Sequence, residues 1–235
     1  MSSARTLCRD MPVRYAKFAD LSIGNRILEI FGGKSTGFFI DIGASHPWVY
    51  NNTWILEKEG WDGILVEPNV HFVELLEKHR EATVVHAALW SEDGEAAFNT
   101  GEMGSALVAT GKKCGSCYNH IMSVETLTIG TFLDRYKDVI PKYVDFISVD
   151  AQYAEHTFYR GLPLAKVISM EIHSEEYQDE ILGYFRKKGY LVEHLGNADY
   201  LFIRQDIFQR IKQCLYSILT KSKRLFWNFS KKNSE

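Results

Sequence analysis

The chain is poor in cysteine and has no long apolar run, and each scarcity excludes a class of protein. Four cysteines in 235 residues do not make a disulfide framework. With 46% hydrophobic and 24% charged residues, the composition excludes a disordered chain or a collagen-like repeat. The longest apolar stretches are strand-sized, well below the ~18 residues that cross a bilayer, and the first ten residues lack the apolar core of a secretory signal. We therefore expect a reducing, cytoplasmic location.

Acidic residues outnumber basic ones over the first 206 residues taken together, and the end of the chain is basic. The formal net charge is −3, and residues 207–235 hold seven lysines and arginines against one acid. This segment therefore carries +6 and the preceding residues −9, so the acidic body is a poor partner for nucleic acid. Apolar residues at helical spacing over 207–219 predict an amphipathic helix, followed by lysines and arginines interleaved with aromatics. Weak peripheral contact with an anionic membrane is one interpretation; a helix packed on the body or on a second subunit is the favoured one.

Short apolar runs separated by helical patterns predict a parallel sheet covered on both faces. The sequence predicts an α/β, Rossmann-like fold whose seven-stranded, mostly parallel sheet ends in an antiparallel edge hairpin. We expect an N-terminal helical segment over 1–36, the catalytic-type domain over 37–205, and the amphipathic helix and basic tail over 206–235. The expected strands cover 37–41, 63–67, 83–89, 144–150, 167–171, 190–195 and 200–204, and residues 101–117 have no regular pattern.

Several of these strands end in a carboxylate, and ligands of such sheets collect at the carboxyl ends of the strands. The loop after Asp41 has a single glycine, Gly43, and lacks the glycine-rich fingerprint that cradles a pyrophosphate, which argues against a nicotinamide oxidoreductase. Glu67 lies where an acid takes the two hydroxyls of a ribose. A ribose, a cationic centre and no phosphate fit S-adenosylmethionine (SAM), with Asp41 facing its ammonium or sulfonium. The alternative is that both acids only cap strand ends.

The motifs at these strand ends resemble those of the FkbM-type methyltransferases. The block Gly60-Trp-x-Gly-Ile-Leu-Val-Glu-Pro-Asn69 is the most specific, and Phe39-Ile-Asp-Ile-Gly-Ala44 and Asp199-Tyr-Leu-Phe202 also match. The resemblance covers roughly residues 37–204. It implies a class I SAM-dependent methyltransferase that methylates oxygen, commonly in sugars or polyketide-type natural products. The predicted cofactor-binding residues are Asp41, Gly43, Ala44, Ser45, Asn52, Glu67, Pro68, Asn69, Ala87 and Ser105.

One motif departs from the family. Where the family has Asp-x-Glu-Gly-x-Glu, this chain has Asp150-Ala-Gln-Tyr-Ala-Glu155. The outer acids survive, and Glu155 is a predicted substrate-binding residue. Tyr153 offers a flat face on which a sugar could stack, or it packs at a helix start. The departure is also the one feature that favours a catalytically silent SAM-fold module.

A hydroxyl acceptor needs a general base within hydrogen-bond reach. Asp150 is the first candidate because it ends the strand beside the cofactor strand. Glu171 and His173 lie two residues apart and would share a face, and His46 follows the cofactor loop. Asp150, Glu171 and His173 could also hold a divalent cation, Mg²⁺ or Mn²⁺, because hard oxygen ligands with one imidazole suit these ions.

The absence of two motifs favours oxygen over nitrogen or carbon as the atom that accepts the methyl group. No Pro-Pro-Tyr or Pro-Pro-Phe clamp of nucleic-acid amino methylases is present, and no Pro-Cys nucleophile. Cys114-Gly-Ser-Cys117 lacks further ligands for zinc and is interpreted as a pair of loop thiols. The leading prediction is a SAM-dependent O-methyltransferase acting on a hydroxyl of a sugar, in a glycan or a glycosylated metabolite. A non-sugar natural product and the silent module are the alternatives.

Overall fold

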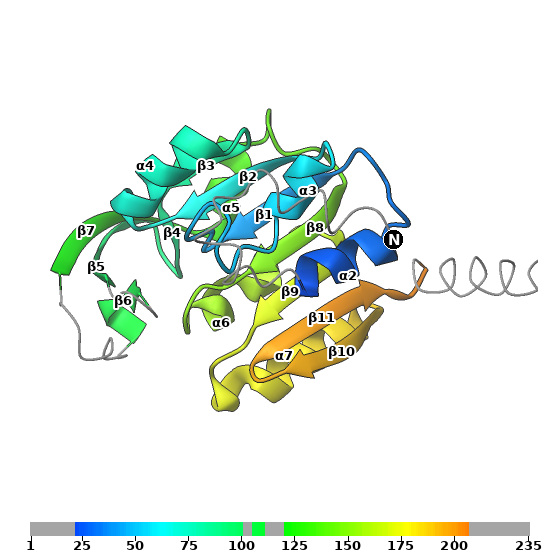
Figure 1. Ribbon diagram of the computed structural model, residues 1–235. Coiled ribbons are helices and arrows are strands. Elements are labelled where there is room, and N and C mark those ends of the chain that lie inside the picture. The colour runs from blue at the N-terminus through cyan, green and yellow to red at the C-terminus, as the bar shows by residue number, and fades with distance from the viewer. Residues whose placement is uncertain (1–21, 101–104, 111–119, 207–235) are drawn as a thin grey trace, which may run out of the picture.

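The computed structural model describes residues 22–100, 105–110 and 120–206 (Figure 1). The predictions for residues 1–21, for Cys114 and Cys117, and for the helix and tail after 206 lie outside these ranges. None of the helices in the described ranges combines the length and apolar character needed to span a membrane.

A seven-stranded sheet forms the centre of the molecule, as predicted. Its strand order is β10-β11-β9-β8-β1-β2-β3. Strand β11 runs in the direction opposite to the other six, so it is antiparallel to both β10 and β9. The strands are β1 (Phe38–Ile42), β2 (Asp62–Glu67), β3 (Thr83–His86), β8 (Val144–Val149), β9 (Ala165–Glu171), β10 (Tyr190–Gly196) and β11 (Asp199–Arg204). The chain steps from β1 outwards to β2 and β3 and then returns to β8 on the other side of β1, so the strand order reverses between β1 and β8.

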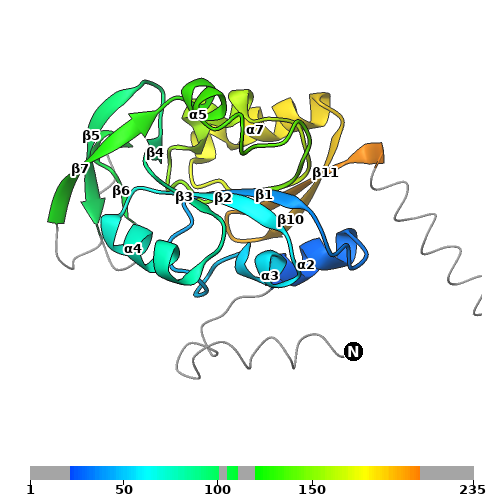
Figure 2. The same ribbon diagram turned by 90° about the horizontal axis from the view of Figure 1, so that it is seen from above.

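Helices cover both faces of this sheet (Figure 2). On one face lie α2 (Ser22–Ile30), α3 (Trp54–Lys58) and α4 (Val70–His79); on the other lie α5 (Ile129–Arg135) and α7 (Glu175–Lys187), with the short α6 (Glu155–Phe158) and η3 (Tyr159–Gly161) near them. Successive residues of β1 serve opposite faces, as the twofold period of a strand requires: Phe39 packs in the core under α2 and α3, and Ile40 in the core under α5 and α7.

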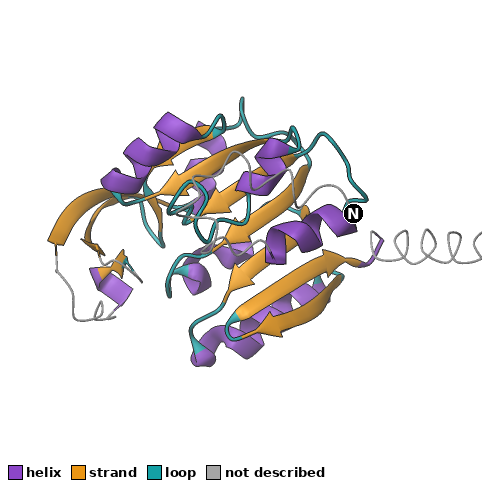
Figure 3. Cartoon of the chain, viewed as in Figure 1, coloured by secondary structure: helices purple, strands orange, loops and turns teal. Residues whose placement is uncertain are grey.

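The predicted edge hairpin is confirmed. Strands β10 and β11 are antiparallel, and the turn between them has Asn197 in the left-handed region at a φ of 50°. Figure 3 shows this hairpin as two strands closed by a short loop. Strand β11 also pairs with β9, which sets Asp199 opposite Glu171.

A second, four-stranded sheet was not predicted. Its order is β4-β7-β5-β6, with β4 (Ala88–Leu89), β5 (Gly94–Thr100), β6 (Ala106–Leu107) and β7 (His120–Leu127), and the turn η2 (Val108–Thr110) follows β6. The single strand predicted over 83–89 is therefore wrong, because the chain leaves the main sheet at Ala87 and continues in the second one. Figure 1 shows β5, β6 and β7 standing out beyond β3. Among the described residues, the separate core of this sheet is a small apolar cluster, and Leu89 and Leu127 of its strands belong to the main core instead. The members of the small cluster are Ala88, Phe98, Leu107 and Val124.

Candidate functional site

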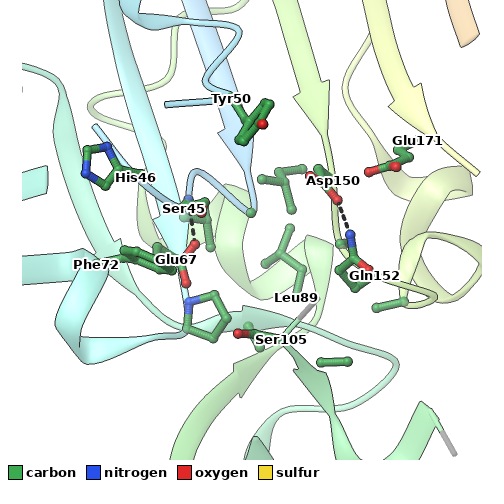
Figure 4. Close-up of a pocket in the computed structure, with 18 of the residues that line it drawn as sticks. Ser45, His46, Tyr50, Glu67, Phe72, Leu89, Ser105, Asp150, Gln152 and Glu171 are labelled. Atoms are coloured by element: carbon green, nitrogen blue, oxygen red, sulfur yellow. Dashed lines mark hydrogen bonds between the residues drawn. The ribbon is translucent and has the colours of Figure 1, made fainter. Parts of the chain in front are cut away.

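A cavity of about 630 Å³ opens at the carboxyl ends of β1, β2, β8 and β9, where the strand order reverses. This volume is within the range of about 300–1,000 Å³ typical of small-molecule sites, and the position is the one at which open α/β sheets bind ligands. The second sheet contributes Phe98, Ser105 and Leu107 to the wall. Figure 4 shows two groups of polar residues across the cavity, Ser45 and Glu67 on one side and Asp150, Gln152 and Glu171 on the other.

Glu67, the last residue of β2, lies in the cavity wall with only 4% of its surface exposed. Its two carboxylate oxygens accept hydrogen bonds from the backbone N–H groups of Ser45 (2.7 Å) and Asn69 (2.8 Å). Burial raises its pKa to about 7, against the lowering effect of these two bonds. A carboxylate has about four lone-pair positions, so Glu67 is held in place and can still accept from two hydroxyls of a ligand.

The loop after β1 brings the backbone close to this carboxylate. Gly43 has a φ of 83°, and its N–H donates to the carbonyl of Val66 at 2.9 Å. A Cβ on Gly43 would lie 1.9 Å from the carbonyl oxygen of Asp150, so only glycine fits between β1 and the end of β8. Ser45 is also left-handed, at a φ of 51°, which turns its N–H toward Glu67.

Asp41 faces away from the cavity. It shares the face of β1 with Phe39, under α3, and its Oδ2 accepts from the Thr53 hydroxyl at 2.6 Å and from the Asn51 amide at 3.3 Å. Burial raises its pKa, while Thr53 and Arg80 lower it. Asp41 therefore supports the cofactor loop from below, and the predicted contact of Asp41 with the ammonium or sulfonium of a ligand is not what the structure shows.

Arg80 completes this buried support. Its guanidinium, which has no exposed surface, pairs with Glu57 at 3.1 Å and donates to the Pro47 carbonyl, the Asn51 amide oxygen and the Thr53 hydroxyl at 3.1–3.2 Å. The network ties residues 47–53 to the start of β3. Each of the three guanidinium nitrogens donates at least one hydrogen bond, as burial of a charge requires.

Across the cavity, Asp150, Glu171 and His173 lie close together, with one side-chain donor atom from each within 4.8 Å of the others. Burial raises the pKa of Asp150 well above its usual range, and the neighbouring Glu171 raises it further. The ion pair between His173 Nε2 and Glu171 Oε1, at 3.3 Å, raises the pKa of the imidazole and lowers that of the carboxyl. Burial and Glu171 thus favour the protonated form of Asp150, while the pair with His173 favours the ionised form of Glu171.

The turn after Asp150 is strained. Gln152 and Tyr153 both have positive φ angles, 42° and 71°, which are uncommon for residues other than glycine. The Gln152 amide donates to Asp150 Oδ1 at 2.8 Å, and the Tyr153 ring stacks on the His173 imidazole with centroids 4.9 Å apart. Tyr153 thus has a left-handed backbone at the position where the motif Asp-x-Glu-Gly-x-Glu has glycine.

Comparison with protein families identifies the chain. The model of the methyltransferase FkbM domain matches residues 41–192, well over half of the sequence. The chain belongs to the FkbM methyltransferase family. It is therefore a methyltransferase by family, and the family implies SAM as the methyl donor.

Solved structures of other methyltransferases are similar in fold. The METTL16 methyltransferase domain is 13% identical over 77% of this chain and 65% of its own, with a TM-score of 0.45, so this chain spans just under two thirds of it. A putative caffeoyl-CoA O-methyltransferase from Staphylococcus aureus is 12% identical over 87% and 93%, also at 0.45. Human methyltransferase 10 domain containing protein is 12% identical over 84% and 90%, at 0.44. Such scores carry no information about substrate. The comparison with curated proteins finds no match.

The cavity of this FkbM methyltransferase fits SAM. Glu67 keeps lone pairs for ribose hydroxyls, and Phe72 beside it gives an apolar surface for a base (Figure 4). When bound, SAM supplies an electrophilic methyl group. In such a complex Glu67, Ser45 and the Gly43 turn would hold the nucleoside, and Asp150 would face the reacting end.

The structure brings most of the predicted site residues to this cavity. Three of the predicted cofactor-binding residues do not line it: Asp41, Ala44, whose carbonyl accepts from Asn51 at 2.9 Å, and Asn69. Those that do are Gly43, Ser45, Asn52, Glu67, Pro68, Ala87 and Ser105, together with His46, Asp150 and Glu171.

The remaining predicted residues lie behind the wall. Glu155 has no exposed surface, and its Oε1 accepts from the backbone N–H of His173 at 3.0 Å. Tyr153 and His173 likewise do not line the cavity; His173 pairs with Glu171, which does, and the Tyr153 ring stacks on His173. This arrangement favours positioning roles for Tyr153 and Glu155 over the direct substrate contact predicted for them.

His46 lines the cavity on the side of Glu67 and Phe72, across from Asp150 (Figure 4). Its Nδ1 accepts from the backbone N–H groups of Trp48 (3.4 Å) and Val49 (3.3 Å). Burial lowers its pKa, and His79 and His71 lower it further. The lowered pKa favours the neutral form of the imidazole, which lies on the Glu67 side of the cavity.

Sequence reasoning missed Gln152, Tyr50, Phe72 and Asp199, which all line the cavity. Asp199 belongs to the edge hairpin, and only the pairing of β11 with β9 brings it beside Glu171. The sequence analysis identified Gln152 as a departure from the family motif but did not place it in the site. Its hydrogen bond to Asp150 depends on a left-handed turn that no sequence pattern predicts here.

Proposed function

We propose that the protein is a SAM-dependent O-methyltransferase that methylates a hydroxyl of a sugar, in a glycan or a glycosylated metabolite. The observation that carries the proposal is Asp150: a half-buried carboxyl in the cavity wall, opposite Glu67, with a raised pKa and a fixed hydrogen-bond partner in Gln152. A general base works best when its pKa lies near the operating pH. Oxygen as the acceptor atom is supported by the absence of the amino-methylase and C5-methylase motifs.

The chain's own residues would act as follows. Glu67, the Ser45 N–H and the Gly43 turn hold the donor, and the cavity aligns the acceptor hydroxyl with the methyl group. As the acceptor oxygen forms its bond to the methyl carbon, the carbon–sulfur bond breaks and the hydroxyl proton passes to ionised Asp150. The Gln152 amide and the nearby His173 charge favour that ionised form. Alignment of this kind can supply about 7–11 kcal/mol of the barrier reduction.

Methyl transfer from labelled SAM to a panel of glycans tests the proposal. Asp150→Asn should abolish turnover and leave the affinity for S-adenosylhomocysteine (SAH) unchanged, because Asn keeps the shape and loses the base. Unchanged turnover would remove Asp150 from this role. Methylation of a non-sugar natural product and of no glycan would replace the sugar by that class.

A catalytically silent SAM-fold module is the second candidate, and the Gln152–Tyr153 turn favours it. An amide stands where the motif has a carboxylate, and a strained tyrosine where it has glycine. SAH binding, together with no methyl transfer to any acceptor, is the result that this candidate requires. Calorimetry with nicotinamide dinucleotide is the negative control.

The divalent cation stays a prediction. One donor atom from each of Asp150, Glu171 and His173 lies within 4.8 Å of the others, and the set of hard oxygens with one imidazole suits Mg²⁺ or Mn²⁺. An ion would compete with the proton on Asp150 and with the His173–Glu171 pair. Activity lost with a chelator and restored by Mn²⁺ would establish the ion; activity insensitive to the chelator would exclude it from catalysis.

A further inference from the structure

The small core of the second sheet is also a wall of the cavity. Three members of this apolar cluster, Ala88, Phe98 and Leu107, line the cavity. Phe98 and Leu107 are each only 4% exposed, so this part of the wall is packed in the structure. The remaining member, Val124 of β7, belongs to the cluster but not to the lining. Most of the apolar core that holds the second sheet together therefore also faces the ligand space.

Strands β5 and β7 form an antiparallel ribbon whose base is anchored to the main body. Asp93, just before β5, accepts from the Thr128 N–H at 2.6 Å and from the Thr131 hydroxyl at 2.7 Å, which joins the ribbon to the start of α5. At the same end, Leu89 and Leu127 pack in the main core. The far part of the ribbon packs in the separate small cluster instead. A ribbon with so little buried apolar surface is only marginally stable by itself.

A SAM-type donor has one part that suits this wall. In the complex inferred for the cavity, the ribose lies at Glu67 and the methyl group faces Asp150, so the flat adenine base is the apolar part that remains. Figure 4 shows Ser105, next to β6, below Glu67, which places the second sheet beside the carboxylate that would hold the ribose. A base packed on an aromatic or apolar wall gains stacking and burial.

Resting on the SAM donor of the proposed function, we propose that the adenine base packs on Phe98 and Leu107 and completes the core of the second sheet, so that donor binding and closure of this sheet are coupled. A ligand that binds the closed sheet and not an opened one stabilises the closed form, by an amount set by its concentration relative to its dissociation constant. Local opening of the ribbon and donor binding therefore oppose each other, and the coupling is reciprocal.

Hydrogen exchange of the full chain, read by mass spectrometry, tests the coupling with SAH as the probe. Without the ligand, amides of β5 and β7 should exchange faster than those of β8 in the main sheet, because the ribbon opens locally. SAH at ten times its dissociation constant should slow the exchange of β5 and β7 about tenfold.

Two apolar truncations on opposite faces of β7 form a matched pair. Val124→Ala removes core atoms that do not line the cavity, and Ile121→Ala removes apolar atoms from a side chain that is 65% exposed. Val124→Ala should speed the exchange of β5 and weaken SAH binding, measured by calorimetry, about fivefold or more. Ile121→Ala should change neither. A wall that is rigid and uncoupled would leave the SAH affinity of both variants unchanged.

A second pair of variants tests the contact with the base. Phe98→Leu keeps an apolar side chain at this part of the wall, whereas Phe98→Ala removes it. Phe98→Leu should therefore retain most of the SAH affinity, and Phe98→Ala should lower it by more than Val124→Ala does, because it loses both the contact with the base and core packing. Equal SAH affinities of the two Phe98 variants would overturn the packing of the base on this residue.

The outcomes separate this inference from the proposed function. Failure of SAH to bind the unaltered chain would overturn the donor site of the proposed function, and this inference with it. With SAH bound, exchange of β5 and β7 that is no slower than without the ligand would overturn the inference alone. So would a Val124→Ala variant that binds SAH as tightly as Ile121→Ala. Should Val124→Ala fail to fold, the exchange of the unaltered chain still decides.

Discussion

Gly43 joins the donor side of the cavity to the acceptor side, and its replacement by alanine tests that junction. The residue has a φ of 83°, and an added Cβ would lie 1.9 Å from the Asp150 carbonyl oxygen and 2.8 Å from its carbon. Both the left-handed backbone and the contact oppose a side chain. Because the neighbour is backbone held by the Asp150 N–H to Ile42 carbonyl bond at 2.8 Å, it cannot move aside alone.

Two other glycines separate the two costs. Gly189 has a φ of 84° with nothing within 4 Å of an added Cβ, so Gly189→Ala should cost only the left-handed penalty, about 1–2 kcal/mol. Gly183 lies within α7 with open space around it, so Gly183→Ala should stabilise the fold by about 0.5–1 kcal/mol. Gly43→Ala adds an overpacking cost of about 1–3 kcal/mol to the strain and should cost about 2–5 kcal/mol in all.

Urea unfolding of the three variants, at equal slope, measures these free energies. The expected order of stability is Gly183→Ala above the unaltered chain, then Gly189→Ala, then Gly43→Ala. Calorimetry with SAH on the folded fraction should also show a weaker site in Gly43→Ala alone, because Asp150 and the loop must separate. A Gly43→Ala variant as stable as Gly189→Ala would refute the close approach of the two strands.

Three further predictions concern single side chains. Burial raises the pKa of Glu67 to about 7, against 4.5 in the unfolded chain, so between these pH values the folded chain binds one proton that the unfolded chain does not. The stabilisation that comes from this proton is complete below pH 4.5 and is lost as the pH rises through about 7. Glu67→Gln should remove this fall, about 3 kcal/mol, from the pH dependence of unfolding; an unchanged profile would contradict the shift. Arg80→Met should destabilise the fold by about 3–5 kcal/mol, because the buried partners lose their cation, and Arg186→Met, an exposed control in α7, should not; equal urea midpoints would argue against the network. Tyr153→Gly relieves about 1–2 kcal/mol of backbone strain and loses an aromatic stack of about 0.5–1.5 kcal/mol. The free energy of unfolding should therefore change by no more than about 1 kcal/mol, while the titration curve of His173 measured by NMR shifts. Tyr153→Phe should restore that curve, and an unchanged curve in the glycine variant would show that the ring does not act on His173.

The outcome for individual elements shows where sequence patterns suffice. The strand ending in Glu67 was predicted from the short apolar run Gly63-Ile-Leu-Val66, a signal carried by the segment alone, and the structure buries all four of these residues. The N-cap of α4 is also a local feature, because the Asn69 side chain accepts from the His71 N–H at 3.0 Å. Strand β7 was missed because most of its contacts are made with β5 across a ribbon that has few buried side chains. No local pattern marks such a strand.

What the sequence by itself determined is the main sheet, its edge hairpin and the presence of acids at the strand ends, since apolar period and turn residues act over a few neighbours. The tertiary structure decided what each acid faces. Asp41 is the last but one residue of β1 and Glu67 is the last of β2, yet Asp41 is enclosed by Thr53 and Arg80 while Glu67 lines the cavity. The tertiary structure also placed Asp199 opposite Glu171 and brought the Gln152 amide into a hydrogen bond with Asp150. Such meetings depend on strand pairing and backbone conformation across the whole fold, which no short stretch of residues specifies.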